Sequence, residues 1–378
     1  MSRTGICMTD QGNRKTKTGT VTRLLQISSL IGLGLLVQAQ FIAAGAEQEF
    51  KPRLGKAKHY NEYWEQQFLF DDDTLVTSQF LITNLPISKQ HGIMLASVKP
   101  PAVPSLIIKN GRKRSGWSVG ADAPSISIFQ HSLSGSDREY SMELKNTTAE
   151  LSLAFKAPAR KIVLTGPNNK LGLPEVTLYA PTATGKGRWR TGPEHTGRDT
   201  YSPWQNISEA RGYGLHVVQD SKPDQSLKRW QRFTSITSPS GNNYQPILHS
   251  FETQKGASET ILVLTAPVGE PIRFEKVTIV PNQDASGWTI LADNGVHRIE
   301  GSVENIKKLE QFNMASHLNG LEKLVAGSMA KIKRSRQVAA YNFSLQASGN
   351  ETIISGQALA EDISFGKPLK KKRRRPRR

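Results

Sequence analysis

Cysteine is almost absent from this chain of 378 residues, which contains only Cys7. Cys7 lies in an N-terminal segment that we expect to be removed on export, so the mature chain would contain no cysteine. Disulfide bonds, thiolate catalysis and cysteine-ligated metal are then excluded together. The eight histidines show no paired ligand spacing. We therefore predict no metal site and no other cofactor.

The motifs of several common enzyme classes are also missing. The sequence contains no G-x-S-x-G nucleophile elbow and no glycine-rich loop with the spacing needed to hold phosphate. The stretch Gly185-Lys186-Gly187 follows a threonine-rich segment and lacks the Walker spacing. These absences argue against classical hydrolase and nucleotide chemistry.

Positive charge is abundant but unevenly distributed. Of the formal net charge of +18, the first 46 residues carry +4 and the last twelve carry +9, which leaves +5 for the body. The body is therefore only mildly basic. Its hydrophobic content, 37% over the whole chain, is sufficient for a folded core in a chain long enough for two domains.

Residues 1–46 have the pattern of a secretory signal peptide. The basic residues Arg14, Lys15, Lys17 and Arg23 precede the apolar run 24–37, and the small-residue site Ala44-Gly45-Ala46 comes after it. The alternative, an uncleaved membrane anchor, needs about 20 apolar residues. We predict cleavage after Ala46 and an exported, periplasmic or secreted protein, with either Met1 or Met8 as the start.

Short runs with period-two alternation recur along the rest of the chain, separated by turns rich in Gly, Asn, Asp and Ser. Such a pattern predicts an all-β sandwich or barrel. Residues 181–214 show no period, and we interpret them as a long connection or a loop over a pocket mouth. The expected strands are 64–70, 75–84, 92–98, 106–110, 125–131, 139–146, 149–157, 175–180, 230–236, 245–252, 260–265, 272–280, 288–293, 297–305, 338–347 and 352–358.

One amphipathic helix is expected in the second half, between Met314 and Lys333. Six apolar residues from Leu318 to Ile332 fall at helical spacing on one face. We expect this helix to pack against a barrel; a membrane-lying helix is the alternative. The basic cluster Lys331, Lys333, Arg334 and Arg336 at its end would extend a basic surface or complement the helix dipole.

The segment YNEYWEQQFLFDD at 60–72, together with TLVTSQF at 74–80, resembles the first hairpin of a known family. This is the lipocalin-type family of carotenoid 1,2-hydratase (hydroxyneurosporene synthase). Gly185, Arg188 and Trp189, and the run GYGLH at 212–216, are similar to the later part of the family's first barrel. The resemblance implies two tandem lipocalin-like β-barrels, at 55–205 and 206–365.

The resemblance also implies an apolar ligand, but one departure bears on activity. Catalytic members carry an Asp-His-Asn-Trp-type motif near the domain junction, and the nearest run here, YSPWQN at 201–206, lacks both the acid and the histidine. We therefore expect a lipid- or isoprenoid-binding protein first. An isoprenoid hydratase is the alternative, and binding of polyanions or of an envelope surface through the basic tail is the second alternative.

The opening strand supplies most of the candidate site residues. Side chains alternate along a strand, so Trp64, Gln66, Phe68 and Phe70 share one face, and Glu65, Gln67 and Leu69 share the other. A barrel of about eight strands is either filled by side chains or holds one small ligand. The same aromatics are therefore either ordinary core residues or cavity lining. The predicted ligand-binding residues are Trp64, Phe68, Phe80, Trp117, His131 and Tyr213.

A hydratase acting on an isolated alkene would need a proton donor in a dry aromatic pocket. Glu65 is the candidate acid, and His91, His131 and His216 are its candidate proton partners, of which His91 and His216 complete the predicted catalytic set. The alternative is that Glu65 faces water from the outer side of its strand.

The C-terminal residues 366–378 are predicted to be a disordered polybasic tail. Behind a signal peptide, the expected partner is an anionic membrane or envelope surface rather than nucleic acid, at about 1 kcal/mol per basic residue near the surface. A solvated tail without a partner is the other interpretation. The surface-binding residues would be Lys370, Lys371, Lys372, Arg373, Arg374 and Arg375.

Overall fold

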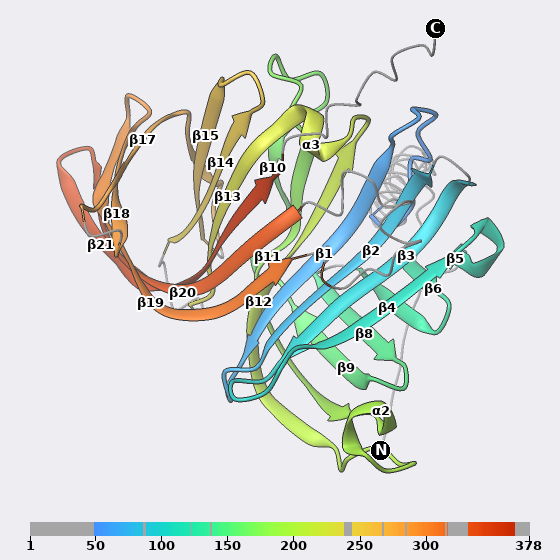
Figure 1. Cartoon of the computed structure of the whole chain (residues 1–378). Helices are drawn as coiled ribbons and strands as arrows, with labels where there is room; N and C mark the ends of the chain where they lie inside the picture. Colours follow the sequence, from blue (N-terminus) through green and yellow to red (C-terminus); the bar gives the residue numbers. More distant parts are fainter. Residues whose placement is uncertain are drawn as a thin grey trace, which may run out of the picture. The chain divides into compact units, whose positions relative to one another are not determined.

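The computed structural model consists mainly of β-strands, as Figure 1 shows, and these form two nearly closed, barrel-shaped sheets. The structure describes residues 49–85, 88–121, 123–136, 138–237, 244–266, 268–283, 286–313, 316 and 332–366. Within these ranges, no helix has the length and hydrophobicity needed to cross a membrane. The predicted all-β class with two tandem barrels is confirmed.

The first sheet, here barrel 1, contains twelve strands among the described residues, in the order β4-β3-β2-β1-β12-β11-β9-β8-β7-β6-β5, with β10 paired to β11. The single turn η1 (Arg114–Gly116) lies between its two end strands. The strands are β1 (Asn61–Phe70), β2 (Leu75–Leu85), β3 (Ser88–Lys99), β4 (Leu106–Arg112), β5 (Trp117–Val119), β6 (Ser125–Ile128), β7 (His131–Ser136), β8 (Glu139–Lys145), β9 (Ala149–Lys156), β10 (Ile162–Thr165), β11 (Glu175–Thr191) and β12 (Gln205–Gln219).

The second sheet, barrel 2, has nine strands in the described part, in the order β16-β15-β14-β13-β21-β20-β19-β18-β17. In both barrels the first strand pairs with the last, β1 with β12 and β13 with β21, so the chain path returns on itself. The strands are β13 (Leu227–Ser235), β14 (Gln245–Thr253), β15 (Ser258–Thr265), β16 (Ile272–Phe274), β17 (Lys276–Pro281), β18 (Gly287–Asp293), β19 (His297–Asn313), β20 (Ile332–Ala347) and β21 (Asn350–Phe365).

The segment 181–214 is not the aperiodic connection that its composition indicated. Most of it belongs to β11 and β12, with the short helix α2 (Pro193–Thr196) between them. Because residues 210–219 of β12 pair with β1 and the start of β12 pairs with β11, barrel 1 extends to Gln219 and passes the expected boundary at 205/206. Barrel 2 begins at β13, after the turn α3 (Pro223–Ser226).

Three apolar clusters form the core. One fills barrel 1 and one fills barrel 2. The third contains residues of both sheets, among them Leu215 of β12, Trp230 of β13 and Ile363 of β21, so the outer walls of the two barrels pack directly against each other. Burial on both faces explains why the strands at this contact, such as β1, are buried along almost their whole length.

The expected helix between Met314 and Lys333 lies mostly outside the described residues. Its last two positions, Ile332 and Lys333, belong to strand β20. Arg334 and Arg336 also lie on β20, where their side chains are only 9% and 4% exposed and pair with glutamates, so the prediction that they extend a basic surface is wrong. The predicted signal peptide at 1–46 and the tail residues Lys370–Lys372 and Arg373–Arg375 fall outside the described ranges.

Candidate functional site

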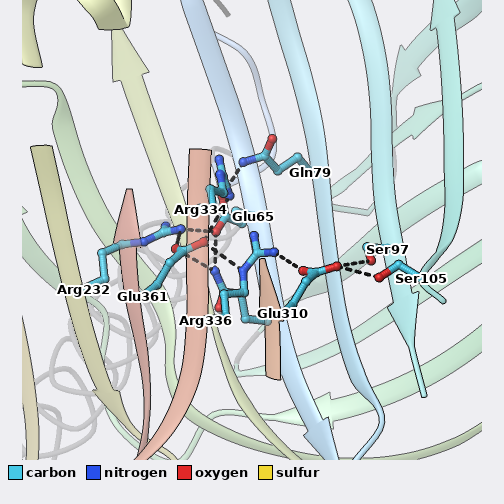
Figure 2. Close-up of polar contacts among 10 residues, drawn as sticks. Glu65, Gln79, Ser97, Ser105, Arg232, Glu310, Arg334, Arg336 and Glu361 are labelled. Atoms are coloured by element: carbon cyan, nitrogen blue, oxygen red, sulfur yellow. Dashed lines mark hydrogen bonds and ion pairs between the residues drawn. The ribbon is translucent and has the colours of Figure 1, made fainter. Parts of the chain in front are cut away.

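Buried charge concentrates where the two barrels meet. Glu65 of β1 projects from the outer face of barrel 1, and its Oε1 lies 2.6 Å from Nη2 of Arg232 on β13. Arg232 also pairs with Glu361 of β21, and Nη1 of Arg334 lies 3.1 Å from Oε2 of Glu65. Figure 2 shows these side chains converging from both barrels.

The same network continues to a third carboxylate. Arg336 of β20 pairs with Glu310 of β19, and its Nε lies 2.8 Å from Oε1 of Glu361. Hydroxyls of Ser97 and Ser105, both in barrel 1, donate to Oε1 of Glu310 at 3.0 and 2.8 Å. We call the six charged residues the arginine–glutamate network: Glu65, Arg232, Glu310, Arg334, Arg336 and Glu361.

This network decides what Glu65 can do. Burial would raise the pKa of Glu65, but the charges of Arg232, Arg334 and Arg336 outweigh it and hold that pKa well below its usual value. Glu65 is thus a paired carboxylate on the outer face of barrel 1, shielded from water by barrel 2. It is neither a proton donor in an aromatic interior nor a solvent-facing acid, so both interpretations of Glu65 are corrected.

The interior of barrel 1 contains a different arrangement, built on rings. The ring centroids of Phe68 and Phe155 lie 4.9 Å apart, and those of Phe155 and Tyr140 lie 5.2 Å apart. Tyr140 contacts Phe50 at 6.1 Å, and Phe50 contacts Trp64 at 6.3 Å. Trp64 is stacked on His216 at 4.7 Å with an interplanar angle of 7°. We call these six residues the aromatic row.

Two glycines of β12 make room for this interior. Gly212 and Gly214 pair with Phe68 and Gln66 of β1, on the interior face. A Cβ at Gly212 would lie 1.9 Å from the carbonyl oxygen of Gln67, and one at Gly214 would lie 2.4 Å from the Tyr179 ring. The two glycines of the run GYGLH are therefore needed at these positions, because the Tyr179 ring and the β1 backbone approach β12 too closely for a side chain.

Polar groups collect at the His216 end of the row. Oε1 of Glu62 lies 2.8 Å from Nε2 of His216, and Oε2 accepts the backbone N–H of Arg53 at 2.7 Å and the hydroxyl of Tyr60. Burial and the Glu62 carboxylate raise the pKa of Tyr60 well above its usual value, so the phenol stays protonated. The carboxylate fixes the orientation of the imidazole ring beside Trp64.

Phe50 is unusual because it belongs to no strand. It lies in a turn, fully buried, in contact with Trp64, Tyr140 and Tyr179. The adjacent Glu49 accepts the Trp64 indole N–H at its carbonyl oxygen, 2.8 Å away. The interior of barrel 1 beside Trp64 is therefore filled, but one of the side chains that fill it, Phe50, comes from a segment outside the barrel wall.

An open groove of about 1260 Å³ borders the row. Tyr140 and Phe155 line it, so the rings that bound the groove are the same rings that contact Phe50 and Phe68. Its charged lining residues are Arg138, Glu139, Lys156, Lys186 and Glu209.

Some of the predicted site residues lie in the interior of barrel 1, and others lie on its outer face. Trp64, Phe68 and His216 come together in the aromatic row, and Phe80, which pairs with Trp64, lies buried in the same core cluster. Trp117 and His131 are also buried in barrel 1: Trp117 donates to the Gln90 carbonyl oxygen at 2.8 Å, and His131 Nε2 lies 2.7 Å from the Asn110 amide.

Tyr213 and His91 lie elsewhere. Tyr213 belongs to the cluster between the barrels, and His91 sits on β3 next to the inward-facing Gly92, so it projects outward. Neither joins His216, which corrects their predicted roles. Sequence reasoning missed Phe50, Glu62, Tyr140 and Tyr179; alternation along β1 does place Glu62 on the face of Trp64.

The tandem lipocalin-type barrel is the class that this fold defines. No protein-family model matches the chain, and no curated protein matches it. Among solved structures, CghA is similar with a TM-score of 0.56 at 9% identity, covering 82% of this chain and 89% of CghA. An AttH-like protein from Nitrosomonas europaea is similar with a TM-score of 0.51 at 9% identity, covering 82% and 93%.

These likenesses agree with the two tandem barrels that the resemblance of residues 60–80 implies. A crystal structure of CghA with Sch210972 is also similar, with a TM-score of 0.53 at 8% identity. At such identities the comparison shows the fold alone.

Replacing Arg232 by Met should destabilise the protein by about 3–5 kcal/mol, because the buried carboxylates of Glu65 and Glu361 would each lose a fully buried guanidinium partner. Urea denaturation of both proteins measures the change. The control is Arg298→Met, since the ion pair of Arg298 with Glu300 is exposed and its loss should cost less than about 1 kcal/mol. Equal effects of the two substitutions would contradict the assigned role of the network.

Stability should fall as the pH drops below about 6.5, the usual histidine pKa. Burial lowers the pKa of His131 to about 4, and burial and Arg232 lower that of His249 well below its usual value. The unfolded chain then binds protons that the folded chain does not, which costs up to about 1.4 kcal/mol per pH unit for each histidine.

Below about pH 4.5, Glu65 and Glu310 add to the same loss, because the pKa of each is lowered in the folded protein. Urea denaturation from pH 8 to pH 4 tests the profile. His249→Gln should reduce the slope between pH 6.5 and 5, and an unchanged slope in this variant would show that His249 is not buried in its neutral form.

Proposed function

We propose that this protein is an exported binding protein that holds a linear apolar molecule, of the lipid or isoprenoid class, along the aromatic row of barrel 1. The observation that carries the proposal is the burial of Phe50, a residue from outside the barrel wall, among Trp64, Tyr140 and Tyr179. The space that holds the Phe50 ring, which belongs to no strand of the barrel, is suited to an apolar group of a ligand with similar width.

The order of groups along the row supports a ligand with one polar end. Rings continue without a break from Phe68 to Trp64, and aromatic faces favour contact with an extended conjugated chain. At the far end, His216 and Glu62 offer hydrogen bonds to a hydroxyl or carbonyl. The groove at Tyr140 and Phe155 offers an approach from solvent.

Binding would require movement of the segment that begins at Glu49. The contacts of Phe50 with three rings must be lost before a ligand takes its place, so the ligand has to replace a buried apolar surface with a larger one. A molecule that extends past Phe50 toward Phe68 meets this condition, whereas a single small ring does not.

Phe50→Ala should bind all-trans-retinol, a fluorescent isoprenoid alcohol, roughly 5–10 times more tightly than the unchanged protein, because the competing ring is gone. The rise of retinol fluorescence on titration gives both dissociation constants. Phe129→Ala, at a ring that is 56% exposed and outside the row, is the matched control and should change nothing.

The hydrocarbon analogue of retinol that lacks the hydroxyl should bind several times more weakly, since a net hydrogen bond contributes about 0.5–1.5 kcal/mol. An unaltered retinol affinity in Phe50→Ala, or no binding to either protein, would reject the aromatic row as a ligand site.

Export is the second part of the proposal, and it rests on the pattern of residues 1–46. The protein recovered from the medium or periplasm of a bacterial host should have the mass of a chain that begins at Glu47. This cleavage would leave Phe50 four residues into the mature chain. A mass that retains Met1 or Met8 in all cell fractions would contradict it.

A further inference from the structure

A two-residue hairpin turn of barrel 1 exposes an aromatic ring. Ile128 of β6 pairs with His131 of β7, so Phe129 and Gln130 form the whole turn. The backbone N–H of Phe129 donates to the Gly116 carbonyl oxygen at 3.0 Å, which joins the turn to η1. The φ of Phe129 is 58°, in the left-handed region that glycine or asparagine usually occupies in such turns. The residue is also 56% exposed, so burial of its ring does not compensate for this unfavourable backbone.

Three consecutive cations lie beside this turn. The guanidinium carbon of Arg112, the last residue of β4, lies 4.1 Å from the centroid of the Phe129 ring. The guanidinium carbon of Arg114 lies 4.1 Å from the centroid of the Trp117 ring. Lys113, between the two arginines, is exposed. We call Arg112, Lys113, Arg114 and Phe129 the basic tip.

The positive charge of the basic tip is not neutralised by acidic neighbours. Among the described residues, the partners of Arg112 and Arg114 are rings and backbone carbonyl oxygens, and none is a carboxylate. The sequence of residues 88–121 contains six lysines and arginines and no acid. Burial and the charge of Arg112 lower the pKa of the neighbouring His131 to about 4, so that imidazole is neutral and does not offset the cations. The charge is therefore available to an anionic partner.

The basic tip is not covered by barrel 2. It lies where η1 connects β4 with β5, which are the two ends of the strand order in the first sheet. Phe129 does not belong to the apolar cluster between the barrels, and Phe129, Lys113 and Arg114 are all exposed. A flat partner can therefore contact the ring and the cations together.

An anionic bilayer surface matches both the charge and the ring. Its phosphate groups attract lysine and arginine, and its interface accepts an aromatic side chain. A single-stranded nucleic acid also attracts cations, but it is bound on several rings in succession, and Arg112 already covers one face of Phe129. We propose that the basic tip docks barrel 1 on a bilayer that contains anionic phospholipids, with Phe129 inserted between the headgroups. This docking surface is separate from the aromatic row and does not depend on it.

Phe129→Gly in the full chain separates membrane insertion from a role in the turn. Glycine adopts a positive φ without steric cost, so the variant should be at least as stable in urea as the unchanged protein. Its binding to vesicles of phosphatidylglycerol and phosphatidylcholine, measured by co-sedimentation, should be about 5 times weaker, because the ring no longer enters the interface. A loss of stability with unchanged vesicle binding would show that the ring only holds the turn, and would overturn the proposal.

The charges are tested with two triple variants that lose the same net charge. They are Arg112→Gln with Lys113→Gln and Arg114→Gln, and, as the control, Lys170→Gln with Lys255→Gln and Lys308→Gln at exposed lysines elsewhere. The first should bind the vesicles at least about 10 times more weakly, since each basic residue near an anionic surface contributes a factor of about five. The control should bind less than about 3 times more weakly in physiological salt, which screens distant charges. Both keep the C-terminal tail, so equal binding of the two variants would assign vesicle binding to the tail or to net charge and reject the basic tip.

A fluorescent label shows which residue enters the bilayer. In the full chain with Cys7→Ser, an environment-sensitive label on Phe129→Cys should become at least about 2 times brighter when phosphatidylglycerol vesicles are added. The same label on Val296→Cys, at an exposed apolar turn residue of barrel 2, should not respond. A response at position 296 and none at position 129 would place the other barrel on the membrane and contradict the proposal.

A single-stranded oligonucleotide of about 20 nucleotides tests the other polyanion. If the charge variant of the basic tip loses oligonucleotide binding, and the label at position 129 does not respond to vesicles, the cations serve a polyanion in solution and bilayer docking is rejected. Retinol titration uses no vesicles, so the aromatic row and the basic tip can fail separately.

Discussion

The arginine–glutamate network is the interaction on which the arrangement of the two barrels depends. Three arginines and three glutamates are removed from water together, and each carboxylate has at least one guanidinium partner across a short distance. A buried charge without its partner costs far more than a lost apolar contact. The network therefore tolerates only one relative placement of β1, β13 and β20, whereas the apolar cluster around it would tolerate several.

Strand β1 connects this constraint to the interior of barrel 1. Its odd-numbered side chains, such as Glu65, face barrel 2, and its even-numbered side chains, such as Glu62 and Trp64, face the aromatic row. Since both faces are fixed by partners, β1 has little freedom to move outward. The wall beside Trp64 is thus rigid, and the position of His216 results from its pairing with Trp64 across the β1–β12 ladder.

The sequence predicts the architecture well because alternation and turn residues are local signals. It also predicts that Trp64 and Phe68 share a face. It does not reveal that Glu65 meets Arg232, because that contact joins strands 167 residues apart. The expected boundary at 205/206 is misplaced for the same reason: only the pairing of β12 with β1 and with β11 assigns residues 205–219 to barrel 1. The low exposure of Arg334 and Arg336 likewise depends on glutamate partners on other strands, which no local sequence pattern predicts.

The rigidity of β1 limits how a molecule could enter the aromatic row. A wall held by paired charges on its outer face does not open, so space must come from elements without such constraints. Among the described residues, the turn that contains Phe50 is held by the indole hydrogen bond of Trp64 to the Glu49 carbonyl oxygen, by the hydrogen bond of the Tyr140 hydroxyl to the Glu49 carboxylate and by ring contacts. A ligand with an apolar body and a polar end can replace contacts of these kinds. The arginine–glutamate network between the barrels would in this way direct a ligand to enter at the turn that contains Phe50 and at the groove beside Tyr140. The arrangement of the two barrels would then be unchanged by binding.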